Sequence, residues 1–177
     1  MNLPNKLTML RIIAIPVFIV VLMLEFRYAA TIIFILAAAT DALDGHIARK
    51  HNLVSNFGKL MDPLADKLLV MAALVCLVEL GDVAAWMVVL ILAREFAVTG
   101  LRQVAVEQGI VIAAAPTGKI KTITQMIAIP LLLLDNWPFA YIGIPMDTIF
   151  LWIAVIMTVV SGTEYFWKNR NVFKNVD

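Results

Sequence analysis

The chain alternates between uncharged, mainly apolar stretches and short segments that carry the charged residues. Six apolar stretches are between 11 and 16 residues long: 12–24, 28–40, 68–78, 83–93, 122–134 and 148–163. A helix that crosses about 30 Å of hydrocarbon needs about 20 residues, so each stretch must draw charged residues into its ends. The pattern therefore predicts six helices, over 8–25, 29–49, 61–80, 83–104, 118–135 and 147–168.

The composition favours a membrane protein. Hydrophobic residues make up 62% of the 177 residues and charged residues 15%, against about 45–50% and about 25% in soluble domains. A water-soluble globule of this length has too little interior to bury so much apolar surface. We therefore expect an all-α integral membrane protein, with one domain over 1–177 that consists of a bundle of six transmembrane helices.

The distribution of positive charge predicts the orientation of the helices. Six spans place both termini on one side, and 13 of the 14 Lys and Arg residues then lie on that side, with Arg27 opposite. The positive-inside rule makes that side cytoplasmic. A cleaved signal peptide is an alternative for the first helix, because Lys6 and Arg11 precede an apolar run. However, no clear cleavage site follows.

Four aspartates are unexpected in helices that would otherwise be passive. Asp41 and Asp44 follow one apolar run and are three positions apart, while Asp62 and Asp66 precede the next run and are four apart. Each pair shares a helix face. The link between the two helices is short, so we expect the helices to be antiparallel neighbours. The four carboxylates would then converge in a polar cavity that is open to the cytoplasmic side.

Carboxylates this close repel one another unless positive charge compensates them. Oxygen ligands suit Mg²⁺ or Mn²⁺, and four of them make two ions plausible. The small residues Gly45, Ala48 and Gly58 would let a bulky ligand approach, and Arg49 is suited to a phosphate. The structural alternative is a salt-bridged cluster with helices packed through small residues.

Residues 41–66 read DALDGHIARKHNLVSNFGKLMDPLAD, which resembles the signature D-x2-D-G-x2-A-R-x8-G-x3-D-x3-D of the CDP-alcohol phosphotransferase family, with every spacer matched. Three further segments, NLPNKLTMLRIIAIP, LAREFAVTGLRQVA and GKIKTITQM, are similar to one bacterial branch of that family. That branch transfers a phosphatidyl group from CDP-diacylglycerol to sn-glycerol 3-phosphate and releases CMP. The resemblance also implies a homodimer in the cell membrane, in contact with lipids and without a nucleic-acid partner.

The resemblance implies a role for each matched position. One metal would be held by Asp41, Asp44 and Asp62, and a second by Asp41, Asp62 and Asp66. Asp66 would also be the general base. The residues assigned to the CDP-lipid are Asn5, Thr8, Gly45, Ala48, Arg49, Ser55 and Gly58.

A phosphorylated acceptor requires a cationic pocket. The candidates lie at the cytoplasmic ends of the fourth and fifth predicted helices: Arg94, Arg102, Lys119 and Lys121. Alternatively, all four are topology charges near anionic lipids. Other family members use inositol phosphate, serine or phosphatidylglycerol as acceptor, and the cationic group argues against serine. A small ion or proton transporter is a more distant alternative, because the far halves of the helices are almost wholly apolar.

Overall fold

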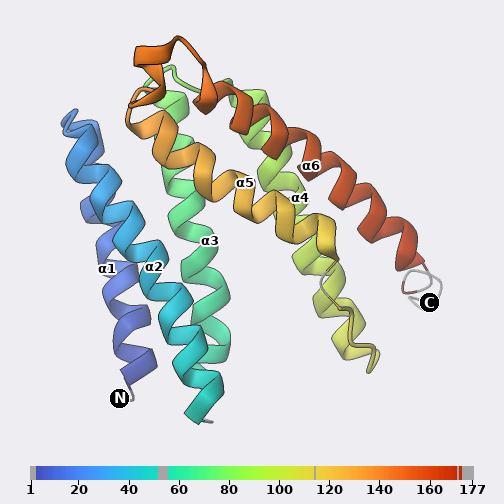
Figure 1. Ribbon diagram of the computed structural model, residues 1–177. Helices are drawn as coiled ribbons and strands as arrows, with labels where there is room; N and C mark the ends of the chain where they lie inside the picture. Colours follow the sequence, from blue (N-terminus) through green and yellow to red (C-terminus); the bar gives the residue numbers. More distant parts are fainter. Residues whose placement is uncertain (1–2, 52–55, 114, 171, 173–177) are drawn as a thin grey trace. The chain divides into compact units, whose positions relative to one another are not determined.

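The computed structural model describes the backbone of residues 3–51, 56–113, 115–170 and 172. Side chains are described for 8–40, 65, 67–113, 115–170 and 172. Over these ranges the chain forms six α-helices and one short 3-10 helix (Figure 1). They are α1 (Leu3–Met23), α2 (Arg27–His51), α3 (Asn56–Glu79), α4 (Ala85–Glu107), α5 (Pro116–Leu133), η1 (Phe139–Ile142) and α6 (Met146–Lys168).

The helices divide into two compact units, Met1–Asp82 and Val83–Asp177. In the first unit, α1, α2 and α3 all pack against one another. The connections between them are short, so α1 and α2 are antiparallel, and so are α2 and α3. The start of α1, the end of α2 and the start of α3 therefore lie at the same end of this unit (Figure 1).

The first unit has an apolar interior and an ion pair at its other end. Phe18 of α1 and Phe34 of α2 are both buried, with ring centroids 6.0 Å apart. Arg27, at the start of α2, forms an ion pair of 2.9 Å with Asp82, just after α3. The aromatic contact and the ion pair fix how α2 packs against its neighbours. These contacts thereby help to hold the end of α2 next to the start of α3, where the aspartate pairs lie.

In the second unit, α6 packs against both α4 and α5. The α6 side chains buried there include the small and polar residues Ala154, Thr158 and Ser161. Small residues let helix backbones approach closely, which is how helices associate without a hydrophobic driving force. A side-chain bond adds to this packing, because Thr117 Oγ1 donates to Glu164 Oε2 at 2.5 Å. The start of α5 is thus joined to α6.

The prediction of an all-α chain with six helices is confirmed over the described residues. Every helix except α4 begins earlier than predicted, and the largest differences are at α1, which begins at Leu3, and at α3, which begins at Asn56. Both helices continue beyond their apolar runs into sequence that mixes polar and apolar residues. Within the described residues, α6 is the one helix whose length and apolar composition suffice to cross a bilayer. Shorter apolar stretches occupy Thr8–Met23 and Arg27–Thr40. Charged residues within the other helices limit their apolar length, as the short uncharged runs predict.

Candidate active site

The four aspartates lie on two helices that pack together in the first unit. Asp41 and Asp44 belong to α2, and Asp62 and Asp66 belong to α3. Helical backbone over both segments places each pair about one turn apart. The α2 pair lies near the end of its helix and the α3 pair near the start of the next. Both pairs are therefore at the same end of the unit, as the sequence predicts.

The side chains of these aspartates lie outside the described part of the chain, so their convergence remains a prediction. Among the residues whose side chains are described, no three His, Cys, Asp or Glu side chains gather as a metal site would require. The donor set predicted for the metal consists of carboxylates at the facing ends of two packed helices. Such a set fits a hard divalent cation.

The predicted CDP-lipid residues whose backbone is described lie at the same end of the first unit. Asn5 and Thr8 lie in the first turns of α1, and Thr8 is fully buried. The small residues and the arginine of the signature lie on helical backbone near the end of α2 or at the start of α3, and their side chains are not described: Gly45, Ala48, Arg49 and Gly58. Ser55 lies outside the described residues.

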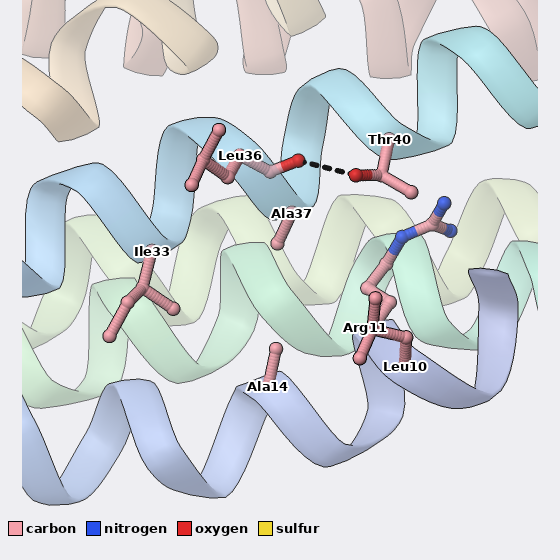
Figure 2. Close-up of a pocket in the computed structure, with 7 residues that line it drawn as sticks. All are labelled: Leu10, Arg11, Ala14, Ile33, Leu36, Ala37 and Thr40. Atoms are coloured by element: carbon pink, nitrogen blue, oxygen red, sulfur yellow. Dashed lines mark hydrogen bonds between the residues drawn. The ribbon is translucent and has the colours of Figure 1, made fainter.

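A cavity of about 230 Å³ lies between α1 and α2 (Figure 2). Apolar side chains form most of its wall, and the two polar residues in it, Arg11 and Thr40, lie together at one end (Figure 2). Arg11 is 2% exposed. Thr40 Oγ1 donates to the carbonyl oxygen of Leu36 at 2.7 Å, and the next residue in the chain is Asp41. The polar end of the cavity thus adjoins the backbone that carries the first aspartate pair.

In the second unit, one carboxylate joins two of the four predicted acceptor-binding cations. Arg94 Nη1 donates to Glu95 Oε1 at 2.9 Å, and Lys121 Nζ donates to the same oxygen at 2.7 Å. Lys121 is 3% exposed, and the side chains of Arg94 and Glu95 are 14% and 19% exposed. Burying a lysine is costly unless a partner compensates its charge. Glu95 supplies that compensation and holds the two cations on one atom.

The other two predicted cations are not part of this arrangement. Arg102 Nε donates to the Tyr165 hydroxyl at 2.7 Å, and the guanidinium carbon lies 5.4 Å from the centre of the same ring. Lys119 is exposed on α5. The structure therefore brings Arg94 and Lys121 together and places Arg102 on Tyr165. Tyr165 was not predictable from the sequence, because an aromatic residue inside an apolar helix carries no signal of such a partner.

The Arg94–Glu95–Lys121 group presents two cationic side chains beside one carboxylate oxygen. Charges in a partly buried site interact more strongly with an anion than they would in bulk solvent. A guanidinium and an ammonium held a few ångströms apart are suited to phosphate oxygens. The chemistry of these two side chains is therefore compatible with a phosphorylated ligand.

Comparison with known proteins identifies the family. Residues 1–160 match the CDP-alcohol phosphatidyltransferase family. The chain is 50% identical, over 98% of its length and 97% of the relative's, to a CDP-diacylglycerol–glycerol-3-phosphate 3-phosphatidyltransferase of Bacillus subtilis. It is 42% identical to the protein of that name in Rickettsia bellii, over 97% of each chain.

A third relative carries a different name. It is a probable phosphatidylglycerophosphate synthase of Mycobacterium tuberculosis, 39% identical over 93% of this chain and 79% of its own. The likeness thus extends well beyond the 26 residues of the signature. On the family match and on these identities, the chain belongs to the CDP-alcohol phosphatidyltransferase family.

Proposed function

We propose that this protein transfers the phosphatidyl group of CDP-diacylglycerol to sn-glycerol 3-phosphate, giving phosphatidylglycerophosphate and CMP. The observation that carries the proposal is the 50% identity, over 98% of the chain, to a relative that is named for this reaction. The Arg94–Glu95–Lys121 group supports the choice of acceptor, because a guanidinium and an ammonium held on one carboxylate oxygen suit a phosphate. The donor is assigned to the signature helices α2 and α3 and to the start of α1.

The donor's pyrophosphate carries negative charge that repels an incoming nucleophile. Mg²⁺ or Mn²⁺ ions, held by Asp41, Asp44, Asp62 and Asp66, would offset this charge and make CMP a better leaving group. Arg49 adds a fixed cation that is suited to a phosphate oxygen. Small residues at Gly45, Ala48 and Gly58 leave space for the nucleotide beside the helices.

Asp66 acts as the general base in this proposal. Its carboxylate takes the proton from the 1-hydroxyl of glycerol 3-phosphate while that oxygen forms a bond to the β-phosphorus of the donor. The bond from that phosphorus to the bridging oxygen breaks, and CMP leaves with the electron pair. A carboxylate suits the role because its oxygen can accept the proton directly.

The acceptor phosphate binds to the cationic side chains of the second unit. Arg94 and Lys121 supply the fixed charges, because Glu95 already restrains both of them. Restrained donors lose little conformational freedom when the anion binds. Arg102, held on Tyr165, and the exposed Lys119 contribute longer-range attraction.

The cavity between α1 and α2 is suited to hydrocarbon of the donor lipid. Its wall is apolar, and its polar end carries Arg11 and Thr40, next to Asp41. An acyl chain in the cavity would bury apolar surface. The donor's charged head would then lie at the end where the aspartate pairs begin.

Members of this family are membrane proteins, and the remaining assignments follow from that setting. We place both termini and the active site on the cytoplasmic side of a bacterial cell membrane, because 13 of the 14 Lys and Arg residues then face the cytoplasm. We also infer one functional domain over 1–177 and a homodimer. The donor stays in the bilayer and the acceptor arrives from water, so the two must meet at the boundary between the membrane and the cytoplasm.

A different acceptor within the same family is the main alternative. Inositol phosphate would also bind to a cationic group, so charge alone does not separate it from glycerol 3-phosphate. Phosphatidylglycerol carries a phosphate as well. A transporter is disfavoured by the identity to named transferases.

An acceptor panel tests the proposed reaction. Purified protein is mixed with CDP-diacylglycerol, magnesium and one acceptor at a time, and CMP release is measured. We expect release with sn-glycerol 3-phosphate and little with inositol phosphate, serine or phosphatidylglycerol. EDTA should stop the reaction, and added magnesium or manganese should restore it. Faster release with another acceptor would overturn the choice of glycerol 3-phosphate.

The substitution Asp66→Asn tests the general base. The amide keeps the size of the side chain but cannot take the proton, so we expect turnover to fall by at least roughly a hundredfold. Circular dichroism should show an unchanged helical content. Glu79→Gln, an exposed residue near the far end of the same helix, is the matched control and should retain normal turnover. A near-normal rate for Asp66→Asn would exclude this residue as the base.

The substitution Arg94→Ala tests the acceptor site. It removes a charged donor but leaves the Glu95–Lys121 ion pair in place, so the protein should fold. We expect KM for glycerol 3-phosphate to rise roughly tenfold or more, because a hydrogen bond to a charged group is lost. KM for CDP-diacylglycerol should change little. Lys119→Ala should raise the acceptor KM less, and Arg170→Ala, exposed beyond α6, serves as the control. Equal effects on both substrates would count against an acceptor site here.

The substitution Ala37→Phe tests the lipid cavity. A phenyl ring at this buried α2 position would occupy space that we assign to the acyl chain. We expect KM for CDP-diacylglycerol to rise while KM for glycerol 3-phosphate stays the same. Ala39→Phe adds the same ring to an exposed position outside the cavity and should have little effect. If the two variants behave alike, the cavity does not bind the donor.

A further inference from the structure

Arg94 lies between two glycines that belong to two other helices. A Cβ atom placed on Gly162 of α6 would lie 3.2 Å from Cγ of Arg94, and one placed on Gly118 of α5 would lie 3.2 Å from its Nη2. Carbon atoms in comfortable contact are about 3.5–4.0 Å apart. Any larger residue at either position would therefore press on the arginine, at its stem from α6 and at its guanidinium from α5.

Neither glycine is required by the shape of its backbone. Both lie within helices, and neither has a positive φ. Glycine is also a poor helix former, so an alanine at Gly162 would favour the helix if space were the only consideration. The space that the two glycines leave is filled by Arg94. Gly118 and Gly162 together thus leave a narrow slot, which the Arg94 side chain occupies.

The position of Arg94 in this slot is not the best one for the stability of the fold. Within the described structure, Arg94 Nε is buried and has no hydrogen-bond partner. A buried donor without an acceptor is unfavourable, so a residue that served only to stabilise the fold would not be expected there. The other contacts fix the rest of the side chain, because Glu95 binds Nη1 while the glycines border Cγ and Nη2.

We propose that Gly118 and Gly162 are positioning residues for the acceptor, because together they set where the Arg94 guanidinium meets the acceptor phosphate. This inference rests on the assignment of Arg94 to the acceptor site. The glycines act through the arginine and have no contact with substrate themselves. A shift of a few tenths of an ångström in Arg94 weakens its hydrogen bonds to a phosphate while leaving the helices intact.

The test compares three single substitutions, Gly118→Ala, Gly162→Ala and Gly100→Ala. Gly100 is the matched control, because it lies on α4, the helix of Arg94, and a Cβ there would meet nothing within 4 Å. We expect the first two variants to raise KM for glycerol 3-phosphate at least threefold, with KM for CDP-diacylglycerol and the melting temperature unchanged or slightly raised. Gly100→Ala should leave both KM values within the error of the assay.

A double-mutant cycle examines the contact at the guanidinium directly. Lysine lacks the Nη2 atom, so Gly118→Ala should add no further increase in the acceptor KM to Arg94→Lys. Additive effects would contradict a contact through Nη2. The positioning role of the glycines would also be contradicted if both glycine variants had the same KM values as Gly100→Ala, or if they lost helical content. Either result would mean that the glycines serve only in helix packing.

The outcomes separate the two proposals. If Arg94→Ala raises the acceptor KM but the glycine variants do not, the slot is wrong and the acceptor site stands. If Arg94→Ala itself leaves that KM unchanged, both the acceptor site and the slot are overturned. The acceptor panel is independent of both results, because it tests the reaction without reference to Arg94.

Discussion

The packing of the second unit depends on a group of charged side chains, Arg94, Glu95 and Lys121, that lies among apolar helices. Lys121 is 3% exposed, and a lysine so buried is unfavourable unless an anion lies beside it. Glu95 is that anion, and its single oxygen also holds Arg94. Removing the glutamate would take away the carboxylate oxygen to which both cations donate. The packing around them, with glycines on α5 and α6, accommodates the arginine.

The helices were predictable because their signal is local. Apolar runs bounded by charge predict six helices, and six α-helices are found over the described residues. Their ends were less predictable, because a helix continues for as long as its backbone bonds can form. The first residues of α1 and α3, LPNKL and NFGKL, mix polar and apolar side chains and do not belong to an apolar run. The apolar run therefore predicts the middle of each helix better than its first residue.

The candidate site was predictable in part. The aspartate spacing places both pairs on helices, at the same end of the first unit. The four cations, in contrast, were treated as one group, although Lys119 and Lys121 are two positions apart on α5. Residues two apart on a helix point about 200° from each other, so both could not face one pocket. The bond from Arg102 to Tyr165 joins residues 63 positions apart, and only the packing of α4 on α6 brings them together.

In the proposed acceptor site, charge and position would have separate roles in the choice of acceptor. The guanidinium of Arg94 and the ammonium of Lys121 would favour any phosphorylated acceptor over serine, because serine has no phosphate to bind. These two charges cannot distinguish glycerol 3-phosphate from inositol phosphate, since both present the same anion. Discrimination between them must come from where the phosphate is held relative to the reacting hydroxyl. In the proposed site, an arginine that is restrained at its stem, at Nη1 and at Nη2 would fix that position, whereas an exposed lysine such as Lys119 would not.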